Sequence, residues 1–129
     1  MKRTKMGKTE SGIQYIASRS TKLIRAQEIY LYNRLVDANN QRPAHEQVPM
    51  LADDLRAYCR IATHVTFQNL KTVDGEKFDM PSYQATDEAH LDAFEHFLNV
   101  DDGTMDSVLT LTNQLNNYTA PRALLPESE

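Results

Sequence analysis

Apolar residues recur at spacings of three and four along most of the chain, which is the pattern of amphipathic helices. The first helix is predicted over residues 21–38, because Ser20 or Thr21 can act as its N-cap and Asn39-Asn40 followed by Pro43 can end it. Its apolar face is predicted to be a stripe of four residues at helical spacing, and three further apolar residues are predicted to widen this stripe. The stripe is Ile24, Leu31, Leu35 and Ala38, and the widening residues are Leu23, Ala26 and Tyr30.

Three more helices are predicted from similar signals. The second runs from Pro49 to about Val65, with the proline in its first turn and two aspartates near its positive end. The third follows Thr86 as N-cap, and the fourth follows Thr104 as N-cap and ends by Pro121. Their apolar faces are Leu51, Leu55, Tyr58, Cys59, Ala62 and Val65, then Leu91, Phe94, Phe97 and Leu98, then Met105, Val108, Leu109 and Leu115.

The pattern changes between the second and third helices. Val65-Thr66-Phe67 is β-branched and aromatic, and Asp74-Gly75 is a strong signal for a hairpin turn. We therefore predict a β-hairpin of residues 66–73 and 76–80 that packs on the helices, because an isolated hairpin is only marginally stable. Residues 12–17 fit either a short strand or the start of a helix.

The chain of 129 residues suits one domain. Residues 1–11 are polar without periodicity, which predicts a disordered basic arm, followed by a single helical domain over 12–118 and a flexible tail over 119–129. The predicted fold class is mainly α, with about four helices and one short β-hairpin. The polar connection of residues 39–47 leaves open that the first helix is a separate arm.

Charge is distributed unevenly along the chain. The net charge is −4, but residues 1–25 carry seven Lys or Arg and one Glu, a net +6, whereas residues 74–129 carry twelve acids and two basic residues, a net −10. One interpretation is a solvated tail and solvated helix faces. The other is a basic arm that docks on an acidic partner or on the acidic half of a neighbouring copy.

Several classes of protein are disfavoured by what the sequence lacks. Cys59 is the single cysteine, no apolar stretch follows the basic N-terminus as in a signal peptide, and no run of about 18 apolar residues could span a membrane. These observations predict a cytoplasmic protein, in the host cytoplasm if it is viral. Nucleic-acid binding is disfavoured because the acidic half would repel phosphates, although the basic arm keeps a nucleic-acid-associated regulator as an alternative.

No motif for catalysis is readable, so we predict no enzyme, no cofactor and no metal site. The four glycines are scattered and form no phosphate-binding loop. Cys59 lies on an apolar stripe and is interpreted as a core residue. Asp87 with His90 and Asp92 with His96 share helix faces and are interpreted as solvated ion pairs.

One stretch carries a family resemblance. Ala57 to Val65 ends a helix, and Asp74-Gly75-Glu76 and Phe78 to Pro81 follow in a short β segment. Then come a helix with Leu91, Phe94 and Phe97 and a last helix ending in Leu115-Asn116-Asn117. This order resembles the small tail-assembly chaperones of long-tailed bacteriophages over roughly residues 50–117.

The resemblance implies a small helical protein that coats the long tape-measure protein before the tail tube assembles and recruits tube subunits. Members of the family often have a frameshifted longer form and are absent from the finished virion. The basic N-terminal segment departs from this family pattern, and no residue is carried over as a functional site.

The predicted function is a non-enzymatic protein-binding module whose partners would be the tape-measure and tail-tube proteins, with a homo-oligomer left open. A chaperone for a helical client needs an apolar groove rimmed by charge. The candidates either line such a groove or form the core between the last two helices: Phe94, Phe97, Leu98, Val108 and Leu109. A further alternative is a structural virion protein, such as a head–tail connector or scaffold-like protein.

Overall fold

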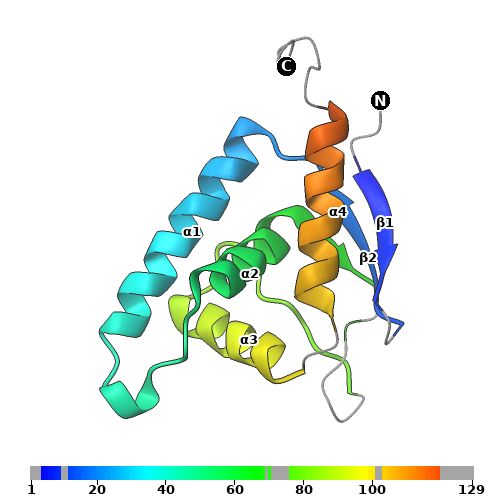
Figure 1. Ribbon diagram of the computed structural model, residues 1–129. Coiled ribbons are helices and arrows are strands. Elements are labelled where there is room, and N and C mark those ends of the chain that lie inside the picture. Colours follow the sequence, from blue (N-terminus) through cyan, green and yellow to red (C-terminus); the bar gives the residue numbers. More distant parts are fainter. Residues whose placement is uncertain (1–3, 10–11, 69, 71–75, 101–102, 120–129) are drawn as a thin grey trace.

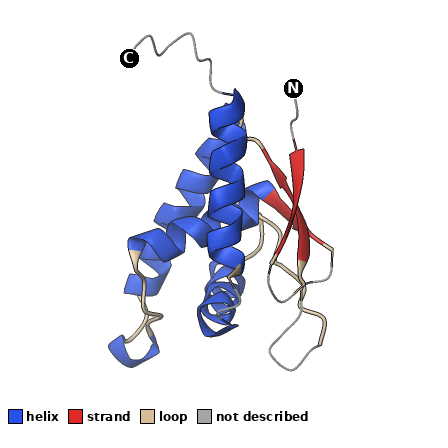
Figure 2. Ribbon diagram, turned by 45° about the vertical axis from the view of Figure 1, so that its right-hand side comes forward, coloured by secondary structure: helices blue, strands red, loops and turns tan. Residues whose placement is uncertain are grey.

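The computed structural model describes residues 4–9, 12–68, 70, 76–100 and 103–119 (Figure 1). Within these residues, a three-stranded antiparallel sheet lies along one side of four α-helices (Figure 2). The mainly α fold class with a short hairpin is confirmed, and the sheet has a third strand. The elements are β1 (Thr4–Lys8), β2 (Gln14–Ser18), α1 (Lys22–Asn40), the short 3-10 helix η1 (Ala44–Glu46), α2 (Ala52–His64), β3 (Val65–Phe67), α3 (Asp87–Val100) and α4 (Thr104–Thr119).

The sheet begins in the segment that the sequence predicts to be a disordered arm. Residues 4–8 form β1, an edge strand that pairs with β2, so the prediction of disorder over residues 1–11 is wrong for this segment. None of the side chains of β1 is buried. Hydrogen bonds of the main chain therefore hold the strand, and a hydropathy pattern does not register these bonds.

The middle strand, β2, settles the alternative left open for residues 12–17 in favour of a strand. Tyr15 and Ala17 point toward the helices and are buried. Tyr15 lies opposite Gly7 of β1, and a Cβ atom at Gly7 would come within 2.5 Å of the Tyr15 ring. Gly7 is thus required by the close approach of this ring.

The hairpin predicted over residues 66–73 and 76–80 differs from the pairing that the structure describes. β3 pairs with β2, far away in sequence, and not with residues 76–80. The Phe78 N–H does donate to the Leu70 carbonyl oxygen at 2.9 Å, so the two predicted arms meet there. The predicted turn at residues 74–75 lies outside the described residues, as does the predicted tail beyond residue 119.

Helix α1 is part of the body of the protein and not a separate arm. It begins as predicted, because the Thr21 hydroxyl oxygen accepts the Ile24 N–H at 3.1 Å. Near its other end, the Asn39 side-chain amide donates to the Val48 carbonyl and accepts the Val48 N–H, both at 2.9 Å. Such a reciprocal pair fixes the connection from α1 to α2.

The starts of two helices differ from the prediction. Helix α2 begins at Ala52 and not at Pro49 as predicted, with Leu51 in the N-cap position. Helix α4 begins at Thr104, but the Gly103 carbonyl accepts the Ser107 N–H, which makes Gly103 the cap. Gly103 has φ of +81°, a conformation that favours glycine. Helix α3 begins after Thr86 as predicted, since its hydroxyl accepts the Ala89 N–H.

The core is centred on Tyr58 of α2, which is fully buried. Its ring lies 5.7 Å from the ring of Phe94 and 6.1 Å from that of Phe97, centroid to centroid. Helix α2 contacts α1, α3 and α4, and so it lies at the centre of the helical layer (Figure 1). Among the described residues, no helix combines the length and the apolar character that crossing a membrane requires.

Candidate functional site

The five candidate site residues divide between the core and one surface depression. Phe94, Phe97 and Val108 are buried core residues, and of these three Phe97 also reaches the wall of the depression. The groove interpretation is wrong for Phe94 and Val108, which are fully buried where α2 contacts α3 and α4. Leu98 and Leu109 are half-buried and line a depression of about 230 Å³.

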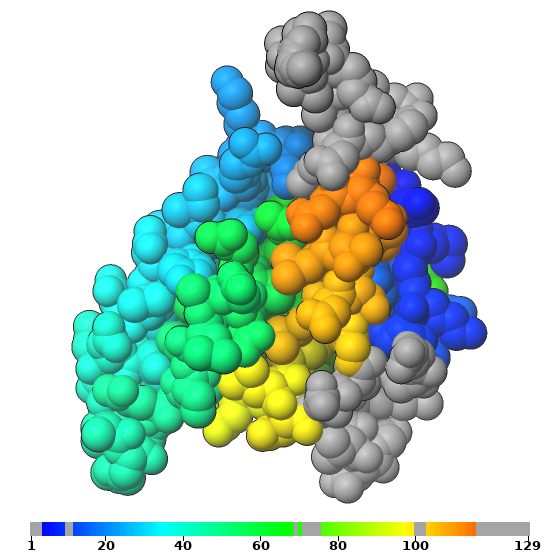
Figure 3. Space-filling view, viewed as in Figure 1, coloured from blue at the N-terminus to red at the C-terminus, as the bar shows by residue number. Residues whose placement is uncertain are grey.

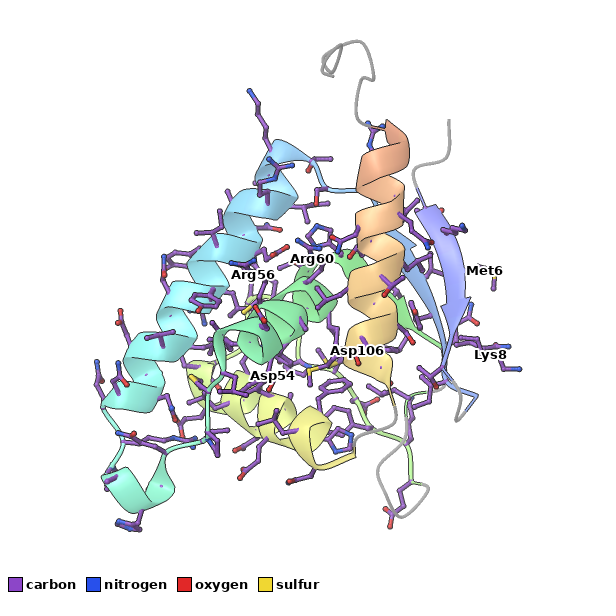
Figure 4. All side chains as sticks on the ribbon, in the orientation of Figure 1. Met6, Lys8, Asp54, Arg56, Arg60 and Asp106 are labelled. Atoms are coloured by element: carbon purple, nitrogen blue, oxygen red, sulfur yellow. The ribbon has the colours of Figure 1, made fainter. Side chains whose placement is uncertain are left out.

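The rim of this depression is acidic. Asp53 and Asp54 come from the first turn of α2, and Asp106 comes from the first turn of α4. Asp54 and Asp106 are labelled in Figure 4. No described residue forms an ion pair with these three carboxylates. No group of three or more His, Cys, Asp or Glu side chains in the described part of the chain is arranged to hold a metal ion.

A larger apolar surface lies on the outer side of α1. Its members are exposed and recur at helical spacing: Leu23, Ala26, Ile29 and Tyr30, which we call the α1 outer face. Leu23 is 67% exposed, Ile29 56% and Tyr30 58%. The prediction that Leu23, Ala26 and Tyr30 widen the buried stripe is therefore wrong, because these three lie on the side of α1 opposite to Leu31 and Leu35, which are buried.

Beside the α1 outer face runs a basic groove between α1 and α2. Arg25, Ile29, Arg56 and Arg60 line it together with Glu28. On this face of the molecule the side chains of α2 lie between those of α1 and α4 (Figure 3). With three arginines and one glutamate, the groove carries a local charge of +2.

Arg60 is held in place, whereas Arg56 is exposed. The Arg60 guanidinium lies 3.3 Å from the Glu28 carboxylate and donates to the Asn113 side chain at 2.9 Å, so it ties α1, α2 and α4 together. Figure 4 shows Arg56 and Arg60 side by side on α2. Because Glu28 is largely neutralised by Arg60, the exposed Arg25 and Arg56 set the electrostatic character of the groove.

The histidines of the two predicted surface ion pairs are not where the sequence placed them. His90 is fully buried, and its Nδ1 lies 2.8 Å from the Tyr58 hydroxyl. Asp87 instead pairs with Arg34 of α1 at 2.6 Å, and the His96 ring stacks on Phe78 at 4.0 Å between centroids. All three contacts join residues distant in sequence, which spacing along one helix does not reveal.

Cys59 is buried in the core, as predicted. Burial raises the pKa of its thiol to about 12, with a further contribution from the Glu28 carboxylate. A thiol with such a pKa stays protonated at neutral pH and is a poor nucleophile.

Another hollow, of about 580 Å³, lies between the end of α2, β3 and residues 77–82. Its walls are mainly apolar and include Ile61, Val65, Phe67, Phe78 and Met80. The charged residues of its lining, Lys77 and Asp79, lie 3.5 Å apart and are more than 80% exposed. Among the described residues that line this hollow, no polar side chain is buried.

Comparisons with known proteins add no relative: no protein-family model matches the chain, and neither a curated protein nor a solved structure does. The surfaces of the molecule are therefore the guide to its function. The α1 outer face and the adjoining basic groove combine exposed apolar side chains with charge.

Proposed function

We propose that the protein is a non-enzymatic protein-binding module that holds a helical segment of a client protein against the α1 outer face. The observation that carries the proposal is the exposure of Leu23 and Tyr30, which lie two turns apart on one side of α1. Apolar side chains at such spacing are the anchors by which one helix packs on another. Exposed apolar groups that cluster in this way mark interaction sites on soluble proteins.

The neighbouring groove adds a requirement on the client. Arg25 and Arg56 are exposed beside Ile29, and Lys22 lies at the start of the same helix. A client helix that placed an apolar stripe on α1 would bring its flanking residues over these cations. We expect those flanking residues to be acidic, because opposite charges at the rim steer association and select the partner.

The order of elements supports a narrower proposal, a tail-assembly chaperone of the long-tailed bacteriophage kind. The client would then be the tape-measure protein, which is long and helical, and the second partner a tail-tube subunit. A chaperone of this kind would cover apolar helix faces of the client until the tube assembles around it. The α1 outer face would recognise only the spacing of apolar side chains on the client and the sign of the charges beside them. Such loose recognition suits a long client that has many similar helical segments.

The test is affinity capture with matched variants, during viral production if the source is a virus. Tagged wild-type protein, the double variant Leu23→Ser/Tyr30→Ser and the control Leu51→Ser are compared, with partners identified by mass spectrometry. Leu51 is a suitable control because it is 70% exposed but lies outside the α1 outer face. Such residues contribute about 2 kcal/mol or more each, so the loss of two central anchors should weaken client binding by about 4 kcal/mol, or roughly 700-fold.

Recovery of one long, helix-rich protein by the wild type and the control, but not by the double variant, supports the proposal. Equal recovery by all three proteins means that α1 is not the docking face. Recovery of nothing but the protein itself contradicts the chaperone function.

A further inference from the structure

The outer edge of β1 is open within the described part of the chain, since β1 is the first strand of the order β1-β2-β3. The direction of its main-chain groups follows from the hairpin with β2. The Thr9 N–H donates to the Ile13 carbonyl, and antiparallel ladders alternate, so Lys5 and Gly7 face β2. Thr4, Met6 and Lys8 consequently direct their N–H and C=O groups outward.

The side chains of β1 leave this edge accessible. Met6 is 63% exposed, and Lys5 and Lys8 are also exposed. Lysines on an edge strand prevent unspecific pairing, because they would be brought against other lysines or against apolar surface. They permit pairing only in a register where each lysine meets an uncharged or acidic neighbour.

We propose that β1 pairs antiparallel with β1 of a second copy about a two-fold axis at Met6, which joins two three-stranded sheets into one of six strands. This register places Met6 opposite Met6, Thr4 opposite Lys8 and Lys5 opposite Gly7. It is also the register that pairs all the outward-facing residues, giving about six hydrogen bonds between the main chains. No described lysine of β1 faces another lysine.

Charge on the helical side of the sheet favours the same arrangement. Helix α4 lies beside β1, and Asp106 lines a depression there together with Gly7 and Lys8 (Figure 4). Lys5 of the second copy would lie opposite Gly7, on the side of the sheet that faces α4, beside the Tyr15 ring that lies over Gly7. Its ammonium group would reach the Asp106 carboxylate, once on each side of the axis.

The remaining surface at the axis is compatible with close approach. The residues of α4 that line the same depression beyond Asp106 are uncharged: Ser107, Thr110, Leu111 and Gln114. On the opposite face of the sheet, the two exposed Met6 side chains would cover each other. The proposed interface is self-complementary, as a two-fold dimer requires.

Sedimentation of the full chain over a range of concentrations tests the pairing. The wild type should pass from a monomer of 14.7 kDa to a dimer as its concentration rises. Met6→Pro should raise the Kd at least about ten-fold, because proline removes an outward donor and is tolerated on an edge strand. A circular dichroism spectrum equal to that of the wild type shows that the variant folds.

Charge exchange provides an independent readout. Asp106→Lys should weaken the dimer, and Lys5→Asp added to it should restore the affinity. Leu51→Ser, far from β1, should leave the Kd unchanged. A wild type that stays monomeric up to about 0.5 mM, or a dimer that Met6→Pro leaves intact, overturns the proposal.

Amide hydrogen exchange resolves the direction of pairing residue by residue. The amides of Lys5 and Gly7 should be protected at every concentration, because they bond within one copy. Those of Met6 and Lys8 should become protected only as the dimer forms. Exchange at Met6 that is equally fast in monomer and dimer excludes β1 from the interface.

Discussion

Mild acid should destabilise the protein through two buried histidines, His64 and His90. The His90 Nε2 lies 3.3 Å from the Tyr83 carbonyl oxygen, and its Nδ1 lies 2.8 Å from the Tyr58 hydroxyl. A carbonyl oxygen only accepts, so Nε2 carries the proton and Nδ1 accepts from the hydroxyl. Protonation of Nδ1 would remove the acceptor of a hydroxyl in the core.

Burial lowers the pKa of both imidazoles below the ordinary value of 6.5. At His64 this effect opposes the attraction of the Glu28 carboxylate, and at His90 it opposes the hydrogen bond with the Tyr83 backbone. The unfolded chain therefore binds more protons than the folded protein below about pH 6.5. The free energy of unfolding falls as the pH decreases through this region, and the two histidines cause no change well above it.

The slope of the free energy of unfolding against pH is at most about 1.4 kcal/mol per pH unit for each histidine, or about 2.7 kcal/mol per pH unit for both. Urea unfolding at constant ionic strength between pH 5 and 8 measures this slope above the range where carboxylates titrate. His90→Asn removes one of the two groups, so the slope of its free energy of unfolding against pH should be lower than that of the wild type, by at most about 1.4 kcal/mol per pH unit. Stability that stays constant from pH 6.5 to 5.5, or a variant with the full slope, refutes the reasoning.

Ile61→Val is the control for destabilisation alone. Ile61 is fully buried and does not titrate. The variant should lose about 0.5–1.5 kcal/mol at every pH and keep the slope of the wild type.

Three further substitutions test local contacts by thermal and urea unfolding. Gly7→Ala should cost roughly 1–3 kcal/mol, because its Cβ atom would strike the Tyr15 ring; a neutral result would mean that the ring moves freely. Glu28→Ala should cost roughly 1.5–3 kcal/mol, since it leaves Arg60 in a largely buried position without its carboxylate, and an unchanged Tm would contradict this. Thr21→Ala should cost about 1 kcal/mol by removing the N-cap of α1, whereas Thr21→Ser should restore it.

The sequence predicts those features of the fold that depend on neighbouring residues. The caps at Thr21 and Thr86 are confirmed, because a hydroxyl and an amide three residues away suffice to form them. The strand β1 was missed, since its stability comes from pairing with β2 and from the Tyr15 ring over Gly7. Neither contact leaves a periodic pattern in residues 4–8.

The candidate surface was missed for a different reason. Periodicity identifies the apolar side chains of a helix but does not say which of them the rest of the protein covers. On α1, Leu31 and Leu35 are covered, while Leu23 and Tyr30 are not. The available signal was the width of the stripe, which exceeds what one packing partner can bury.

The two proposed surfaces lie on opposite sides of the molecule, with α1 at one side of the helical layer and β1 at the far edge of the sheet (Figure 1). A dimer through β1 would therefore leave both α1 outer faces open and could hold two segments of one long client. Linked binding of this kind strengthens attachment without any new contact. Met6→Pro should then weaken binding to a long client and leave the affinity for a single helical segment unchanged. Leu23→Ser/Tyr30→Ser should instead weaken binding to the single segment and leave the dimer intact. The contrast between these two variants separates the two surfaces.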